Sequence, residues 1–349
     1  MNVEQRLTAM RDVIQQDVGN RGLACDPDDN LLTACPDDFA AACKSLAETP
    51  NAYMAIITGF LIPTADPPSG ETDGPLGAIF LARALVPLGI RIRIITDSFC
   101  RRALEAGVAA CGLEDAVLVA TLPPASHPWQ TFLELDWRTC LRGGLSEKDD
   151  WRGQRITHLL ALERVGPSHT TNTMWKQPGA TEEIVDEFHS AVSVDHQARC
   201  HTMRGRDITE LMSPAHLVFE ETARAKPPVV TIGIGDGGNE IGMGKIPWRT
   251  IQRNIPNGGL IACRVPTDYL IVAGVSNWGG YALAAGVALL RGKPLAEELF
   301  DVDREREILR VMVEAGPLVD GVTGKPTVSV DGLSFEEYVK PLRRLAKLT

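Results

Sequence analysis

Short apolar runs alternate with longer segments of helical periodicity along most of this chain. The apolar runs are rich in β-branched residues, as buried strands are, and they span residues 53–57, 90–96, 116–120, 156–162, 229–234 and 269–275. Apolar positions recur at helical spacing in residues 75–88, 98–109, 182–190, 208–223, 278–291, 304–314 and 335–348. This alternation predicts an α/β fold with a mostly parallel, twisted sheet and helices on both faces.

The length of 349 residues is enough to bury one large core, and we expect a single domain over residues 1–349. An amphipathic pattern near the start predicts an N-terminal helical region within residues 1–48. Two stretches break the alternation of strands and helices. Residues 121–155 are rich in Pro, Trp and charge, and residues 171–205 carry His, Trp and Arg. We predict that both are loop insertions over the sheet edge.

Charge and cysteine usage exclude several classes of protein. The net charge is −10 and no dense run of Lys and Arg occurs, which argues against a nucleic-acid-binding surface. The N-terminus lacks the pattern of a signal peptide, and no run of about 18 apolar residues could span a membrane. The eight cysteines show no C-x-x-C pair and no zinc spacing, so we predict a cytoplasmic protein in a reducing environment. The oligomeric state stays open, with a homo-oligomer among the options.

The most informative motif is the glycine-rich run at residues 233–244, which begins within the predicted strand 229–234. It holds six glycines, with Asp236, Asn239 and Glu240 among them. A turn between a strand and a helix needs one or two glycines. The larger number indicates backbone amides that a ligand can approach closely, with a tight structural connection as the alternative.

Familiar nucleotide-binding loops do not explain this run. Gly233, Gly235 and Gly238 satisfy G-x-G-x-x-G, but no acid follows about 20 residues later to bind a ribose. The phosphate-loop pattern fails as well, because Asn239 replaces its first glycine and Ile246 replaces its Ser/Thr. Carboxylates in the loop would also repel a phosphate unless a metal stood between them. The loop therefore suits an ammonium group, a metal ion or proton transfer.

Further polar residues follow the predicted strands, whose carboxyl ends meet at one edge of a parallel sheet. Asp73 lies two residues before Pro75, so a helix cap and a ligand contact are both open for it. Glu163 and Arg164 come directly after a buried run. We favour a functional role for this charged pair, with a structural ion pair as the alternative.

Two later segments offer groups that bind carboxylates. Arg204 precedes a predicted helix, and its guanidinium can bind a carboxylate through two hydrogen bonds. Ser276 and Asn277 open another helix, whose free amides suit an anion, with simple capping as the alternative. Acids and cations together indicate a zwitterionic ligand such as an amino acid.

The run at residues 235–244, Gly-Asp-Gly-Gly-Asn-Glu-Ile-Gly-Met-Gly, resembles the signature of the D-glutamate cyclase family. Residues 71–75, 163–166 and 203–208 agree with the family pattern in the same order, and the resemblance covers roughly residues 50–330. The resemblance implies a stand-alone form of this domain. It also implies a lyase that converts D-glutamate, or a related amino acid, to 5-oxo-D-proline with loss of water.

Such a reaction needs a base, a proton donor and donors for the oxyanion. Our hypothesis gives the base role to Glu163 or Asp236 and the proton donor role to Glu240. Arg204 would bind the α-carboxylate, and the backbone amides of Gly237 and Gly238 would face the γ-carboxyl. The further predicted substrate contacts are Asp73, Arg164, Gly237, Gly238, Asn239, Ser276 and Asn277.

Two departures from the family pattern leave the substrate open. The link between the Glu-Arg loop and the Met-Arg-Gly loop is expanded by residues 170–200, and His201 stands near the place of an expected aromatic residue. One alternative is a metal-dependent hydrolase or lyase in which Asp73, Asp236 and Glu240 bind Mg²⁺ or Mn²⁺ through oxygen atoms. Another is a protein that binds an amino acid or a nucleotide without catalysis.

Overall fold

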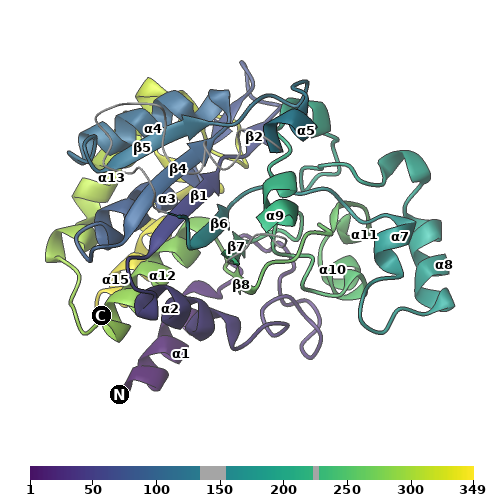
Figure 1. Cartoon of the computed structure of the whole chain (residues 1–349), viewed down its shortest axis with the longest axis horizontal. Coiled ribbons are helices and arrows are strands. Elements are labelled where there is room, and N and C mark those ends of the chain that lie inside the picture. The colour runs from purple at the N-terminus through teal and green to yellow at the C-terminus, as the bar shows by residue number, and fades with distance from the viewer. Residues whose placement is uncertain (134–154, 223–227) are drawn as a thin grey trace.

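The computed structural model describes residues 1–133, 155–222 and 228–349. A six-stranded sheet with the strand order β5-β4-β1-β6-β7-β8 runs through its centre (Figure 1). All neighbouring strands are parallel, and each corresponds to a predicted strand. The strands are β1 (Tyr53–Thr58), β4 (Arg91–Thr96), β5 (Val117–Thr121), β6 (His158–Leu162), β7 (Val230–Gly235) and β8 (Tyr269–Val272). The predicted α/β fold class is confirmed.

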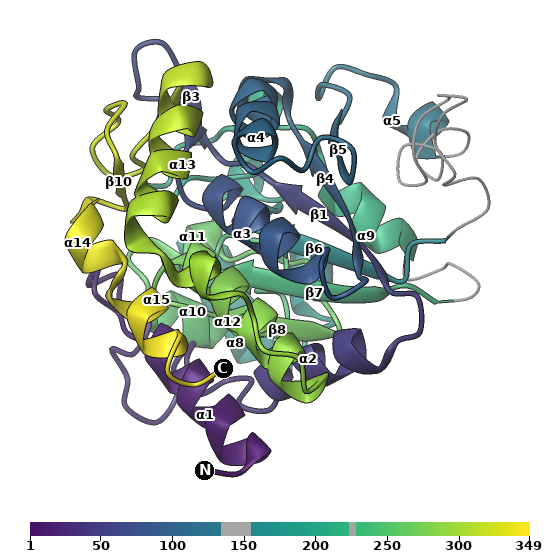
Figure 2. The same cartoon turned by 90° about the vertical axis from the view of Figure 1, so that its left-hand side faces the viewer.

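Alternate strand residues point to two separate hydrophobic cores, because side chains alternate between the faces of a sheet. Ile56 and Ile94 belong to one core, whereas Ala55 and Ile95 belong to the other. The first core is covered by α1 (Val3–Ile14), α2 (Asp38–Glu48), α3 (Pro75–Leu85), α4 (Ser98–Ala110), α12 (Ser276–Leu290), α13 (Val302–Ala315), α14 (Phe335–Tyr338) and α15 (Lys340–Leu345). Figure 2 shows α3, α4, α12 and α13 in front of the sheet.

The second core is covered by shorter helices. They are α5 (Trp129–Thr131), α7 (Thr171–Met174), α8 (Glu182–Ala191), α9 (His216–Thr222), α10 (Trp248–Asn254) and α11 (Gly258–Ile261). The predicted helices on both faces are therefore present. None of the helices in the described parts of the chain is both long enough and apolar enough to cross a membrane.

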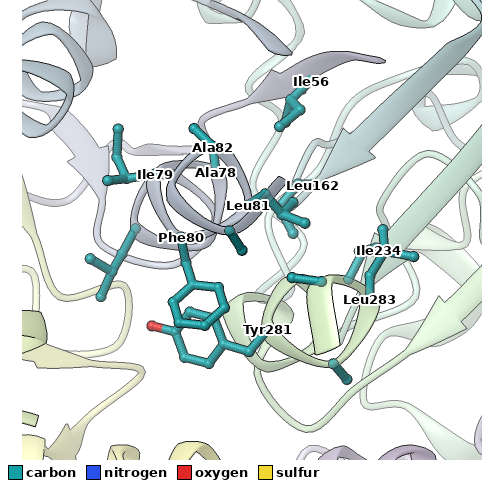
Figure 3. Close-up of a cluster of buried hydrophobic side chains, with 14 of the residues drawn as sticks. Ile56, Ala78, Ile79, Phe80, Leu81, Ala82, Leu162, Ile234, Tyr281 and Leu283 are labelled. Carbon is teal, nitrogen blue, oxygen red and sulfur yellow. The ribbon is translucent and has the colours of Figure 1, made fainter. Parts of the chain in front are cut away.

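The core beneath α3 and α12 anchors the strand ends that carry the polar motifs (Figure 3). Phe80 of α3 packs against Tyr281 of α12 with ring centroids 4.3 Å apart. Leu162 and Ile234, near the ends of β6 and β7, are fully buried in the same core. Because interiors are packed as densely as crystals, these contacts hold the chain rigidly just before the polar loops begin.

Proline explains where the predicted helices are interrupted. The predicted helix 208–223 divides into a 3₁₀ turn, η3 (Thr209–Leu211), and α9, because Pro214 lies between them and cannot continue a helix.

The N-terminal region is helical only in α1 and α2, with residues 15–37 forming a long loop between them. This loop matters for the site described below.

Of the predicted insertion 121–155, residues 134–154 lie outside the described residues. The predicted insertion 171–205 contains α7, α8 and η2 (Val194–His196). It packs against α10, where the rings of Phe188 and Trp248 lie 5.5 Å apart. The remaining elements are a small sheet of β2 (Leu61–Ile62), β3 (Ser69–Glu71) and β9 (Leu318–Val319), the hairpin β10 (Ser329–Val330) and β11 (Leu333–Ser334), and η4 (Glu297–Phe300).

Candidate active site

Buried acidic side chains from several distant segments meet beyond the carboxyl ends of β6 and β7. The members of this acid cluster are Glu71, Asp73, Glu163, Asp236, Glu240 and Asp331. Carboxylate oxygens of Asp73, Asp236 and Asp331 lie within 4.8 Å of one another, and so do those of Glu163, Asp236 and Glu240. Asp236 belongs to both groups and is therefore the centre of the cluster.

Arg21 supplies a buried positive charge to the acid cluster. Its guanidinium forms ion pairs with Asp236 and, at 2.9 Å, with Asp331. It comes from the 15–37 loop, where the carboxylate of Asp17 accepts hydrogen bonds from the amides of Arg21 and Gly22. Arg21 and Asp331 were not predicted as site residues, because neither lies in a recognised motif or after a strand of the main sheet.

Glu163 is held in an unusual backbone conformation at the end of β6. Its φ of 46° lies in the left-handed region, which costs free energy for a residue other than glycine. Its Oε2 accepts a hydrogen bond of 2.6 Å from Oγ of Ser276. A strained residue with a buried carboxyl group and a fixed orientation is typical of a functional site.

Asp73 and Asn277 hold the starts of each other's helices. The carboxylate of Asp73 accepts hydrogen bonds of 2.8 Å from the amides of Ser276 and Asn277 at the start of α12. The side-chain oxygen of Asn277 in turn accepts hydrogen bonds from the amides of Gly74 and Gly77 at the start of α3. Gly74, not Asp73, is the N-cap of α3. Asp73 therefore caps a helix that is distant in sequence, and both side chains have the structural partners expected of capping residues.

Close packing accounts for several glycines of the glycine-rich run. A Cβ on Gly233 would lie 2.6 Å from the carbonyl oxygen of Ile241. Gly238 has a φ of 92°, and a Cβ there would lie 2.9 Å from a methyl group of Ile251. These glycines allow the run to fold back tightly on β7, so the structural reason for them is strong.

Alanine at Gly238 is expected to destabilise the protein by about 1–2 kcal/mol, from a strained φ together with a steric clash. Gly89 is a matched control, because its φ is 80° but no atom of the described residues lies within 4 Å of the position that a Cβ would take there. Gly89→Ala should lower the free energy of unfolding only by the backbone strain of the positive φ, and urea unfolding measures both losses. Equal losses in the two variants would show that the contact with Ile251 is not restrictive.

Donors of the run bind partners within the loop and in neighbouring segments. The amide of Asp236 donates to Oε1 of Glu240 at 3.0 Å, and the amide of Gly237 also faces this carboxylate. The side-chain amide of Asn239 donates to the carbonyl oxygen of His201 at 2.8 Å. The loop therefore uses its donors to orient Glu240 and the 201–206 segment, whereas a role of the Gly237 and Gly238 amides toward a substrate stays a prediction.

Arg164 lies in a structural ion pair. It is fully buried, pairs with Asp97, and donates hydrogen bonds to the carbonyl oxygens of Gly59 at 3.0 Å and Ser213 at 2.6 Å. This is the alternative that the sequence left open for the Glu-Arg pair. Glu163 and Arg164 therefore have different roles. Glu163 faces the acid cluster, whereas Arg164 connects the end of β6 to the surrounding loops through its ion pair and hydrogen bonds.

A cavity of about 390 Å³ opens onto the acid cluster. Its inner wall contains Glu71, Glu163, Asp236 and Asp331, and Arg204 lies among its outer residues. Asn239 lines it as well. The other predicted site residues do not line it, and they are Asp73, Arg164, Gly237, Gly238, Glu240, Ser276 and Asn277. Four of the predicted residues thus meet at one cavity, and Ser276 and Glu240 contact its lining acids through hydrogen bonds.

Burial changes the protonation of these acids. It raises the pKa of Glu163, and the nearby carboxyl of Asp236 raises it further. Burial also raises the pKa of Asp236, although the Arg21 charge opposes this shift. The pKa of Asp331 is raised to about 6 by burial, again against the effect of Arg21.

One buried guanidinium cannot balance six ionised carboxylates at close range, so part of the cluster is protonated at neutral pH. Glu240 is a good candidate for a protonated member. Burial raises its pKa against the opposing effect of hydrogen bonds from the amides of Asp236 and Gly237, and its Oε2 is buried with no hydrogen-bond partner among the described residues. The cluster can therefore hold a carboxylate base and carboxylic acids side by side, which is an arrangement suited to proton transfer.

Comparison with known proteins identifies the family of this chain. The family model described as D-glutamate cyclase-like, C-terminal, matches residues 10–196 and 190–346. The chain belongs to this family. It is also 28% identical over 370 aligned residues to the human protein named D-glutamate cyclase, mitochondrial. All of this chain but only 53% of the human protein is covered, so the chain spans about half the length of that relative.

Two groups of three buried carboxylates could hold a metal ion. The predicted ligands Asp73 and Glu240 fall into different groups, which share Asp236. In the group with Asp73, the Arg21 guanidinium already pairs with Asp236 and Asp331. The group with Glu240 retains the unpartnered Oε2, and its oxygen ligands fit a hard ion such as Mg²⁺ or Mn²⁺. Glu163, Asp236 and Glu240 would hold such an ion, which would polarise a carboxyl oxygen of a bound substrate.

Proposed function

We propose that this protein is an enzyme that converts D-glutamate to 5-oxo-D-proline and water. The observation that carries the proposal is the acid cluster at the inner end of a cavity that also contains Arg204. Membership of the D-glutamate cyclase-like family and the name of the human relative support the same reaction.

The reaction transfers two protons from the α-ammonium nitrogen to one γ-carboxyl oxygen. A carboxylate takes the first proton, and the free amine then attacks the γ-carbon. The new C–N bond closes the ring while the C–O bond breaks. Carboxylic acids of the cluster supply two protons to the departing oxygen, one before the attack and one as the C–O bond breaks, so that it leaves as water. The nitrogen loses its second proton to a carboxylate of the cluster, which restores the starting protonation. A carboxylate and a carboxylic acid in contact provide both functions without a change of site.

We assign the base role to Asp236 or Glu163, because both line the cavity. Asp236 has the ion pair with Arg21 that favours its ionised form, whereas Glu163 is fixed by the hydroxyl of Ser276. Glu240 lies behind them and would return protons through them. Arg204 would bind the α-carboxylate, so that the substrate is held with its chain folded toward the acids.

The test is incubation of the purified protein with D-glutamate and, separately, with L-glutamate, each with Mn²⁺ and with EDTA. The product, 5-oxoproline, is measured by chiral chromatography against a blank without enzyme. We expect product from the D form only. Product that forms only with Mn²⁺ would favour the metal-dependent version, and tight binding of D-glutamate without product would favour a binding protein.

We also propose that the protein works in a reducing compartment, because all seven cysteines in the described residues are free thiols. The word mitochondrial in the name of the human relative applies to that protein. A cytoplasmic location and a homo-oligomer stay predictions, and a fluorescent fusion and light scattering would test them.

A further inference from the structure

The outer half of the cavity has features that D-glutamate would not use. A volume of about 390 Å³ falls in the range of roughly 300–1,000 Å³ that is common for pockets of drug-sized ligands, which are larger than an amino acid. The walls of the cavity also include the apolar side chains of Phe60, Ile62, Pro63 and Val322. Glutamate has two charged ends and a short aliphatic chain, so these walls have no obvious partner in it.

Arg206 is a second cation in the outer cavity for which the reaction of D-glutamate has no role. Between Arg204 and Arg206, Gly205 has a φ of 79°, which turns the chain sharply. Arg204 donates to the carbonyl oxygen of Val322 at 3.5 Å, and Arg206 donates to that of Pro63 at 3.4 Å. Both are long contacts with neutral acceptors, and neither guanidinium has an ion pair within the described residues.

The two arginines are directed to different walls of the cavity. Val322 follows β9 and Pro63 follows β2, and these strands flank β3 on opposite sides in the small sheet. The central strand β3 ends at Glu71, which belongs to the acid cluster. A ligand that lies across this small sheet can therefore present one carboxylate to each arginine while its middle faces the acids.

We propose that the site accepts γ-amides of D-glutamate whose leaving amine carries a carboxylate, and that Arg206 binds this carboxylate. The inference rests on the proposed function, since the same ring closure would produce 5-oxo-D-proline. In such a substrate, Arg204 binds the α-carboxylate and the apolar outer walls contact the leaving group. The simplest member of the class is a γ-D-glutamyl amino acid.

The chemistry of an amide suits the acid cluster better than that of a free γ-carboxylate. A γ-carboxylate is an anion among acids and must be protonated before attack, whereas an amide carbonyl is neutral. The α-amine attacks this carbonyl and forms the ring C–N bond, while the original amide C–N bond breaks. The α-nitrogen gives up one proton to a carboxylate, and the leaving nitrogen receives one from a carboxylic acid. The reaction is balanced without water, an oxidant or any other co-reactant.

Kinetics with three substrates test this inference. γ-D-Glutamylglycine, D-glutamine and D-glutamate are compared by formation of 5-oxo-D-proline, and release of glycine is measured for the first. We expect kcat/KM for γ-D-glutamylglycine to exceed that for D-glutamate by about tenfold or more, since one ion pair contributes about that factor. D-Glutamine is the matched control, because its leaving group is ammonia and has no carboxylate.

Arg206→Gln is the deciding variant. It should raise KM for γ-D-glutamylglycine by about tenfold and leave KM for D-glutamine and D-glutamate unchanged. Arg199→Gln is the control variant, because Arg199 is partly exposed and does not line the cavity, and its Nε lies 3.9 Å from Oδ2 of Asp207. It should change none of these constants.

The outcomes separate the two proposals. Turnover of D-glutamate without release of glycine would overturn the γ-amide inference and leave the proposed function intact. Release of glycine without turnover of D-glutamate would support the γ-amide class and overturn the proposed substrate. An equal rise of KM for all three substrates in Arg206→Gln would also overturn the inference, because it would place Arg206 on a part that the substrates share.

Discussion

Replacing Glu163 with glutamine is expected to lower kcat for D-glutamate cyclisation by about 10²–10⁴-fold, which is the usual contribution of a group that transfers protons. Glutamine has nearly the same shape, and its carbonyl oxygen can still accept the hydrogen bond from Ser276. It cannot take up or release a proton at the pH of the reaction. The loss should therefore fall on kcat, with little change in KM, and it is measured by initial rates of 5-oxo-D-proline formation.

The same change at a surface position separates chemistry from general damage. Glu297 is exposed in η4 and does not line the cavity, so Glu297→Gln should keep full activity. Thermal unfolding should show that Glu163→Gln is folded, since the substitution removes a buried acid without leaving a cavity. Full activity of Glu163→Gln would exclude Glu163 from proton transfer and leave Asp236 as the base.

Replacing Arg21 with methionine is expected to destabilise the protein by about 3–5 kcal/mol near pH 8, because it leaves the partner carboxylates buried without a cation. Arg21 pairs with Asp236 and Asp331, and its charge lowers the pKa of both carboxyl groups. Methionine keeps much of the volume of the side chain. The loss should therefore come mainly from the charge.

The loss should be smaller near pH 5. Burial raises the pKa of these carboxyl groups in the folded state, and the pKa of Asp331 becomes about 6. Between pH about 4 and the folded pKa, the folded protein therefore binds more protons than the unfolded chain. Stability from these groups is present at low pH and falls as the pH rises through that window. Without Arg21 the folded pKa values rise further and the fall becomes steeper. Urea unfolding of both proteins at pH 5 and pH 8 measures the difference.

Asp29→Asn is the matched control for this experiment. Asp29 holds the same N-terminal loop through Thr250 at 2.7 Å and Arg253 at 3.2 Å, but it does not line the cavity. Because Asp29 and Arg253 are both half-exposed, the loss should be about 1 kcal/mol or less, and it should not grow between pH 5 and pH 8. A pH-independent loss in Arg21→Met would mean that Arg21 acts through packing.

The helices and strands differ in how well local sequence predicts them. The six strands of the main sheet are all where apolar, β-branched runs lie, because strands that are wholly or mostly buried need such residues. Helices α10 and α11 were not predicted. They are only seven and four residues long, too short for a helical period to stand out, and packing against α8 stabilises them.

In the glycine-rich run, too, the local sequence predicts the backbone conformation but not the contacts. Its sequence indicates a special backbone, and the structure has one. The sequence cannot tell which group each amide contacts, and the amide of Asp236 contacts Glu240 of the same loop. Asp73 likewise has the composition of a cap, but the helix that it caps begins at Ser276, far along the chain.

The sequence by itself determined the α/β fold, the family and most of the acids in the cluster, because strand burial and the glycine-rich motif are local patterns. Only the tertiary structure decided which charges meet. It brought Arg21 from the N-terminal loop and Asp331 from the C-terminal hairpin to Asp236, and it directed Arg164 to Asp97. These ion pairs join residues that are far apart in the sequence, so no local sequence pattern reveals them. The distances between such residues in the fold follow from the packing of the two hydrophobic cores against the sheet.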